Sequence, residues 1–138
     1  MKVSELMSKK LVKVTSIAML HEVAQKMRQE NIGVIPVEDN GKLVGLVTDR
    51  DIAVNAVAKG EINCAVKDVM THNPVTLNAN ATVEEAIQTM LKQNIRRLPV
   101  MDNGKLVGLV SLEDLLESGK DQDLLKALRT FHEKTKHQ

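Results

Sequence analysis

Aromatic residues are almost absent from this chain, and their absence limits what it can bind. Phe131 is the single aromatic residue, and there is no Trp or Tyr. Proteins that bind single-stranded nucleic acids depend on aromatic side chains on which the bases stack. Lys and Arg total 19 against 18 Asp and Glu, and the lysines are scattered rather than gathered in a stripe. We therefore expect no nucleic-acid partner.

Cysteine is equally scarce, and long apolar runs are missing. The one cysteine, Cys64, cannot form an internal disulfide or a cysteine-based zinc cluster, and the four histidines show no metal-site spacing. No stretch reaches about 18 apolar residues, and the amino terminus, MKVSELMSKK, lacks the apolar segment of a secretory signal. We expect no metal, no membrane association and a cytoplasmic location.

What the sequence does contain is a duplication. Residues 3–52 align with residues 66–115 without a gap, and about twenty of the fifty positions are identical. The match is densest where DNGKLVGLV occurs twice, at residues 39–47 and 102–110. With 43% hydrophobic residues in a chain of 138, the two copies have enough apolar side chains for an aliphatic core.

The duplication predicts the domain organisation. We expect a first repeat at residues 1–60, a linker at 61–65, a second repeat at 66–118 and a C-terminal amphipathic helix at 119–138. In that last segment Leu124, Leu125, Leu128 and Phe131 fall on one side of a helix. Such an apolar side usually packs on its own domain or on a partner subunit.

Helical spacing is clear in both repeats. In the second repeat, Thr82 and Glu85 form a capping-box pattern ahead of apolar residues at helical intervals, namely Val83, Ala86, Ile87, Met90 and Leu91. The first repeat carries Leu20, Val23, Ala24 and Met27 at the same period. Met19 replaces the capping threonine there, so the start of that helix is less sharply defined.

Two strands joined by a tight turn follow each helix. Val34–Val37 and Leu98–Met101 are short apolar runs, and each is followed by Asp-Asn-Gly and then Lys-Leu-Val-Gly-Leu-Val. Asn-Gly between apolar runs predicts a hairpin, because both residues tolerate positive φ. Each half therefore has the order β-α-β-β-α, which gives an α/β (α+β) fold. Neither half can bury both faces of its sheet alone, so we expect a pseudo-twofold pair packed sheet to sheet.

A polar motif stands where each second strand leads into a helix. Thr48-x-x-Asp51 and Ser111-x-x-Asp114 each place a hydroxyl and free backbone N–H groups at a helix start, with a carboxylate one turn later. Such donors favour an anion, and a carboxylate can accept hydrogen bonds from the vicinal diol of a ribose. The same spacing also describes a simple helix cap. From the spacing alone, both interpretations stay open.

The repeated pattern resembles a tandem pair of CBS domains, also called a Bateman module. It is carried by Ile95-Arg96-Arg97-Leu98-Pro99-Val100, by Gly108-Leu109-Val110-Ser111-x2-Asp114, and by their counterparts at Ile32–Val37 and Gly45–Asp51. The resemblance covers roughly residues 1–118 and extends to small stand-alone bacterial proteins made of little beyond such a pair. It implies a regulatory module that binds AMP, ADP, ATP or S-adenosylmethionine in the cleft between the repeats, with no obligatory cofactor.

The resemblance also implies roles for individual residues. The aspartates Asp51 and Asp114 would take the ribose hydroxyls, and Thr48 and Ser111 would approach the ribose or phosphate. The residues just before and at the start of the first hairpin strand would line the base or contact phosphate. In this sequence they are Gly33, Val34 and Ile35 in one repeat and Arg96, Arg97 and Leu98 in the other.

The two repeats differ in charge at these last positions. Arg96 and Arg97 offer two guanidinium groups to phosphate oxygens, whereas Gly33 and Val34 offer none. We expect the Ser111/Asp114 pocket to take a phosphorylated ligand. The Thr48/Asp51 pocket binds weakly, binds an uncharged adenosyl group or stays empty, unless Arg50 supplies charge. The alternative for the two arginines is a solvated pair that meets Glu113 or Glu117 on the surface.

Two functions remain in competition at this point. The first is a non-enzymatic sensor of an adenosyl ligand, which forms a homodimer and signals to an unidentified regulated protein. The second is a ligand-free structural or interaction module in which the aspartates only cap helices. Similar modules occur inside inosine monophosphate dehydrogenases, but 138 residues are too few for the catalytic barrel of such an enzyme.

Overall fold

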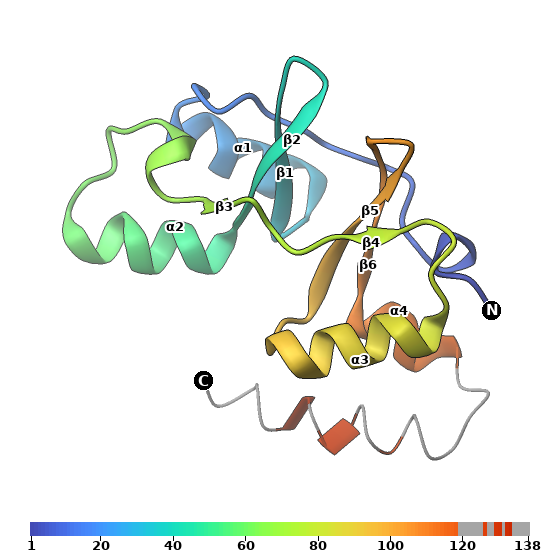
Figure 1. The fold of residues 1–138 in the computed structure, drawn as a ribbon. Coiled ribbons are helices and arrows are strands. Elements are labelled where there is room, and N and C mark those ends of the chain that lie inside the picture. The colour runs from blue at the N-terminus through green and yellow to red at the C-terminus, as the bar shows by residue number, and fades with distance from the viewer. Residues whose placement is uncertain (119–125, 127–128, 131, 134–138) are drawn as a thin grey trace. The chain divides into compact units, whose positions relative to one another are not determined.

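The structure of the chain is a computed structural model, which describes residues 1–118, 126, 129, 130, 132 and 133. The predicted amphipathic helix at 119–138 falls almost entirely outside these residues, and so do Leu124, Leu125, Leu128 and Phe131. The repeats themselves lie within the described part. Its elements (Figure 1) are, in chain order, η1 Val3–Glu5, α1 Leu20–Glu30, β1 Val34–Asp39, β2 Lys42–Thr48, α2 Asp49–Asn55, η2 Val57–Lys59, η3 Val66–Asp68, β3 Thr71–His72, β4 Leu77–Asn78, α3 Val83–Gln93, β5 Arg97–Asp102, β6 Lys105–Ser111 and α4 Leu112–Ser118.

Both predicted hairpins form. β1 pairs antiparallel with β2, and β5 with β6, and each pair closes through a two-residue Asn-Gly turn. In the first turn Asn40 has φ 51° and Gly41 has φ 76°, and Asn103 and Gly104 repeat these values. Positive φ at both central residues matches the right-handed twist of the flanking strands. The turn sets the pairing of the residues next to it, and an irregularity at Val37/Glu38 and at Val100/Met101 shifts the register of the rest of each hairpin.

The long helices begin where the pattern predicted, with different caps. The hydroxyl Oγ1 of Thr82 accepts a hydrogen bond from the backbone N–H of Glu85 at the start of α3. Met19 gives α1 no side-chain cap, and the N–H of Leu20 donates instead to the carbonyl of Cys64. A backbone carbonyl from the linker thus satisfies one of the donors that a side chain leaves unpaired.

The described chain forms two compact α/β units, each with a three-stranded sheet. One unit spans Leu11–Pro74 and has the strand order β1-β2-β3, with α1 and α2 (Figure 1). The other combines Met1–Lys10 with the chain from Val75 onward and has the order β4-β5-β6, with α3 and α4. The compact units therefore do not coincide with the sequence repeats.

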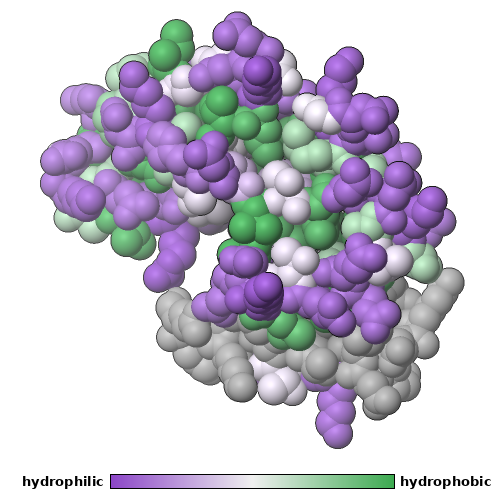
Figure 2. All heavy atoms as spheres, in the orientation of Figure 1, coloured by the Kyte–Doolittle hydropathy of each residue, from purple (hydrophilic) through white to green (hydrophobic). Residues whose placement is uncertain are grey.

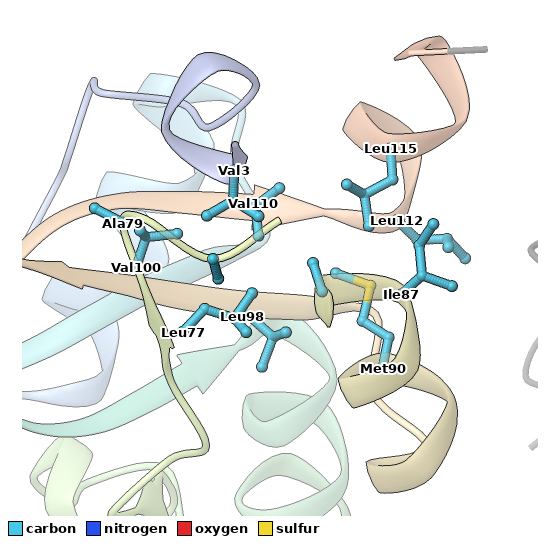
Figure 3. Close-up of a cluster of buried hydrophobic side chains, with 12 residues drawn as sticks. Val3, Leu77, Ala79, Ile87, Met90, Leu98, Val100, Val110, Leu112 and Leu115 are labelled. Carbon is cyan, nitrogen blue, oxygen red and sulfur yellow. The ribbon is translucent and has the colours of Figure 1, made fainter. Parts of the chain in front are cut away.

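The difference arises because each repeat contributes its opening segment to the other repeat's core. Val3 is fully buried in the cluster that contains Val110 (Figure 3), and its counterpart Val66 is fully buried in the cluster of the other unit. The backbone follows the same exchange, since Val3 N–H donates to Ala81 and Val66 N–H donates to Ala18. Neither repeat has a complete core without this segment.

Glycines in the second hairpin strands make room for the exchanged segments. A Cβ at Gly108 would collide with the side chain of Met7, and a Cβ at Gly45 would collide with that of Met70. Met7 and Met70 are equivalent in the duplication, as are the two glycines. The same close packing of a methionine side chain on a strand glycine therefore occurs once in each unit.

Both cores are aliphatic, as the composition requires. The cluster in Figure 3 includes Leu98, Met90 and Leu112, which are fully buried. The other cluster is built around Val23, Ile35 and Val47, also fully buried. The surface seen in Figure 2 is mostly hydrophilic, with smaller apolar areas among the charged side chains. Within the described residues, no helix has the length and apolar character needed to cross a membrane.

Candidate functional site

The Thr/Ser-x-x-Asp motifs lie at the junctions of β2 with α2 and of β6 with α4. Thr48 is the N-cap of α2: its N–H donates to Oδ2 of Asp51 (2.9 Å), and its Oγ1 accepts from the N–H of Asp51 (3.1 Å). Ser111 and Asp114 make the same two bonds at 2.9 and 3.1 Å. Both motifs are reciprocal capping boxes, so the helix-cap interpretation of the sequence is correct in both halves.

The backbone N–H groups that were expected to bind an anion at these helix starts are already hydrogen-bonded within the protein. At the start of α2, the N–H of Asp49 donates to the carbonyl of Gly33 (2.9 Å), and the N–H of Arg50 donates to Oδ1 of Asp49 (2.8 Å). At the start of α4, the N–H of Leu112 donates to the carbonyl of Arg96 (2.8 Å). The prediction of free backbone donors at these helix starts is therefore wrong. An anion at either junction depends on side chains for its partners.

The two aspartates keep one carboxylate oxygen unused by the cap. Asp51 and Asp114 are half-buried, and each engages only Oδ2 in its box. Among the described residues, Oδ1 of neither aspartate has a hydrogen-bond partner. A carboxylate has about four lone-pair sites, so each aspartate can accept a hydroxyl proton from a ligand without giving up its cap.

The hairpin register places one further predicted residue beside each hydroxyl. Val34 lies directly opposite Thr48, and Arg97 lies directly opposite Ser111. Directly opposed residues of an antiparallel pair share one face of the sheet, with Cβ atoms about 5 Å apart. β5 begins at Arg97, so Arg96 precedes the strand and is not bound by its alternation.

Ile35 and Leu98 occupy a different environment from their neighbours. Both side chains have no exposed surface, and they pack in the core of their own unit. The next position along a strand faces the opposite side of the sheet from Val34 or Arg97. These two residues therefore hold the strand in place from within the core, while the preceding residues stand at the junction.

Arg96 is held by an ion pair. Its Nη2 lies 2.7 Å from Oε1 of Glu113, in the first turn of α4. This is one of the two surface partners that the sequence offered for the arginines. Partial burial raises the pKa of Glu113, but a bond from its own backbone and the charges of Arg96 and Arg97 outweigh that effect, so the pKa lies below its ordinary value.

The first half has a different arrangement at the equivalent positions. Gly33 stands in place of Arg96, and a Cβ there would lie only 2.8 Å from Oδ2 of Asp49. Asp49 itself replaces the fully buried Leu112, and Arg50 replaces Glu113. A carboxylate thus lies beside the backbone at the position where the second half carries a guanidinium group. Sequence reasoning overlooked Asp49, although aligning the repeats shows this exchange of leucine for aspartate.

The part of the chain that the structure describes contains no cluster of side chains that could hold a metal ion. No three His, Cys, Asp or Glu side chains there lie close enough together to hold an ion. Cys64 is a half-buried free thiol whose Sγ lies 3.5 Å from the carbonyl oxygen of Glu61. The side chains at the two junctions carry hydroxyl, carboxylate and guanidinium groups.

Comparison with known proteins identifies the fold family. The CBS domain model matches this chain twice, at residues 3–57 and 66–121. The chain belongs to the CBS domain family. CBS domain-containing protein YhcV of Bacillus subtilis is 40% identical over 114 residues, which are 82% of this chain and 81% of the relative.

Solved CBS domain pairs share the fold. The CBS domain pair of protein MJ0100, in complex with 5′-methylthioadenosine and S-adenosyl-L-methionine, is 33% identical with a TM-score of 0.79. The match covers 88% of this chain and 98% of that one. CBSX2 in complex with AMP is 26% identical with a TM-score of 0.74, over 86% of this chain and 95% of its own.

Proposed function

We propose that this CBS domain pair is a regulatory module that binds an adenosine-containing ligand and signals its presence to a partner protein. The observation that carries the proposal is that two solved CBS pairs of the same fold are complexes with adenosyl compounds, methylthioadenosine and S-adenosylmethionine in one and AMP in the other. AMP, ADP, ATP and S-adenosylmethionine are the candidate ligands. The module performs no catalysis of its own.

The second half supplies the groups that a nucleotide requires. Oδ1 of Asp114 accepts a ribose hydroxyl while Oδ2 keeps the cap, and Ser111 lies beside it at the strand end. Arg97, opposite Ser111, and Arg96 supply positive charge for a phosphate. This half is therefore the one that takes a phosphorylated ligand.

The first half suits a different ligand class. Thr48 and Asp51 repeat the hydroxyl and carboxylate, but the carboxylate of Asp49 lies beside Gly33. A phosphate bound here would lie close to this negative charge, and the repulsion between the two charges increases as the distance between them decreases. The first half accordingly binds an uncharged or cationic adenosyl group, or remains unoccupied.

Regulation requires that the ligand distinguish two states of the module. A ligand shifts an equilibrium only by the difference between its affinities for the two states. The partner reads the surface of the state that the ligand favours. The chain itself forms a homodimer in this proposal, and sedimentation velocity of the purified protein tests that part independently of any ligand.

The test of ligand binding is thermal unfolding of the purified chain with AMP, ADP, ATP, methylthioadenosine or S-adenosylmethionine, and with GMP as the control nucleotide. A ligand at about 100 times its dissociation constant stabilises the folded state by about 2.7 kcal/mol, which raises Tm by several degrees. We expect this shift with at least one adenosyl compound and a smaller one with GMP.

Two variants separate the binding role of Asp114 from its capping role. Asp114→Ala removes the ribose acceptor and one hydrogen bond of the capping box of α4, whereas Thr82→Ala removes only one capping hydrogen bond, at the start of α3. We expect both to lower Tm without ligand and only Asp114→Ala to lose the ligand-induced shift. No shift with any adenosyl compound, in protein shown by mass spectrometry to carry no bound ligand, would reject the proposal.

The second candidate function is a ligand-free structural or interaction module. The reciprocal capping boxes favour it, because Asp51 and Asp114 already have a structural role within their own halves. In addition, α2 buries none of its residues, and Val54 is 47% exposed. This candidate predicts a flat ligand panel, together with aspartate variants that lose stability only through their caps.

A further inference from the structure

One of the two positive charges available to a ligand phosphate in the second half, that of Arg96, is already committed to a protein group. Leu112 N–H donates to the carbonyl of Arg96, and Arg96 Nη2 pairs with Glu113 at 2.7 Å. Arg96 is thus tied to the first turn of α4 through both its backbone and its side chain. Because Ser111 and Asp114 use their own N–H groups in the capping box, backbone donors there cannot replace the arginine.

The ion pair is weak enough to be displaced. The side chain of Arg96 is 36% exposed and that of Glu113 is 53% exposed, and exposed pairs of this kind contribute about 0–1 kcal/mol. A phosphate offers several oxygens and up to two charges to the planar fork of an arginine, whereas Glu113 reaches it through the single Oε1 contact. Arg96 Nε has no partner among the described residues.

We propose that Glu113 is a specificity-determining residue: its carboxylate competes with the phosphate of a ligand for Arg96, and so limits how strongly this half prefers phosphorylated over uncharged adenosyl compounds. The inference rests on the proposed adenosyl-binding function and deepens it. A phosphorylated ligand that engages Nη2 of Arg96 must break the Arg96–Glu113 pair and then lie near the released carboxylate. An uncharged ligand leaves the pair intact.

The duplication shows that this competition belongs to one half only. At the equivalent positions the first half carries Gly33 and Arg50, so neither the arginine nor its acidic competitor is present. The pair Arg96 and Glu113 therefore forms a unit that exists once in the chain. Its effect on ligand choice can be removed without altering the first half.

The test is isothermal titration calorimetry of the full chain with adenosine and with AMP, each at one fixed low ionic strength. The measured quantity is the ratio of the adenosine dissociation constant to the AMP dissociation constant. We expect Glu113→Gln to raise this ratio about two- to fivefold, because an exposed ion pair worth up to about 1 kcal/mol changes a dissociation constant by no more than about fivefold. The affinity for adenosine itself should stay unchanged.

Glu117→Gln is the matched control, because it removes the same charge from the same helix at another exposed position. It should leave the ratio as in the unmodified chain. Arg96→Gln should lower the ratio, and the double variant Arg96→Gln/Glu113→Gln should show much less of the gain seen with Glu113→Gln alone. That non-additivity is the signature of action through Arg96. Urea unfolding of every variant verifies that it is folded, and Glu113→Ala provides a second substitution at the same site.

The outcomes separate the two proposals. If the unmodified chain binds adenosine and AMP but Glu113→Gln and Glu113→Ala leave their ratio unchanged, the competition is refuted and the adenosyl-binding function stands. If Glu117→Gln raises the ratio as much as Glu113→Gln, the effect is one of general charge and the inference is also wrong. If the unmodified chain binds neither compound, the inference is rejected, whereas the proposed function is rejected only if no compound of the adenosyl panel shifts Tm.

Discussion

The two halves of this chain have nearly the same backbone plan and opposite charge at one place. In the second half Arg96 pairs with Glu113, the residue that follows the buried Leu112. In the first half Gly33 lies against Asp49, and the residue that follows Asp49 in the helix is Arg50. The capping boxes beside these residues are the same in both halves. Duplication therefore preserved the groups that fold the junction, while the groups that set its charge diverged.

The largest difference in stability between the two halves should come from Leu112 and from Asp49, which occupies the equivalent position in the first repeat. Leu112 has no exposed surface, so Leu112→Ala should lower the free energy of unfolding by about 2–5 kcal/mol, as large-to-small core substitutions do. Asp49 is exposed, and Asp49→Ala should cost less than about 1 kcal/mol. Urea unfolding monitored by circular dichroism measures both. Equal losses at the two positions would contradict the asymmetry of the two junctions.

The glycines under the exchanged segments should respond alike in the two halves. Gly108→Ala pushes a methyl group into Met7, and Gly45→Ala pushes one into Met70, so each should cost about 1–3 kcal/mol through overpacking. Chemical denaturation of each variant gives the loss. Adding Met7→Ala to Gly108→Ala should cost less than the sum of the two single changes. Strict additivity would show that the two side chains are not in contact.

The helix caps should also behave alike. Asp51→Ala and Asp114→Ala each remove one side of a reciprocal box and should each lower the free energy of unfolding by about 1 kcal/mol in the absence of ligand. Asparagine at either position keeps an oxygen that can accept the same bond, so the Asp→Asn variants should lose less. A loss confined to one half would mean that the two boxes differ in spite of their matching geometry.

The smallest effect should be the pH dependence of the Arg96–Glu113 pair. The pKa of Glu113 is lower in the folded chain than its ordinary value of 4.5. The stability from its charge is therefore present above the unfolded pKa and is lost as the pH falls through the folded one. Because the pair is exposed, we expect no more than about 0.5 kcal/mol.

This contribution is measured as the stability difference between the unmodified chain and Glu113→Gln. The difference should be present at pH 7 and should shrink as the solution is acidified below pH 4.5. Glu117→Gln serves as the control for general charge. A difference that grows on acidification would reverse the assigned sign and contradict the ion pair.

The sequence predicted local structure well because local interactions decide it. The Asn-Gly turns fixed both hairpins, since Asn40 and Asn103 take up the positive φ that the turn demands. Thr82 capped α3 as its spacing indicated. The start of α1 could not be predicted as sharply, because its first donor is satisfied by the carbonyl of Cys64, which is distant in the sequence.

The candidate site was predicted in part. Residue spacing placed Thr48, Asp51, Ser111 and Asp114 at the strand-to-helix junctions, where they lie. It could not show that the backbone donors are consumed there, because that depends on the distance from the carbonyls of Gly33 and Arg96 to the helix starts. The core positions of Ile35 and Leu98 likewise follow from where each strand begins.

The sequence alone determined the duplication, the order helix, strand, strand, helix within each repeat, the turns and the two capping motifs, whereas the strand predicted ahead of α1 is not among the strands of the structure. All of these follow from interactions between residues close together in the chain, and a period of 63 residues carries them twice. Only the tertiary structure decided that Val3 packs into the core of the second repeat and Val66 into the core of the first. It also decided that Glu113, rather than Glu117, pairs with Arg96. The physical reason is that packing and ion pairing depend on distances in space, which spacing along the chain does not specify.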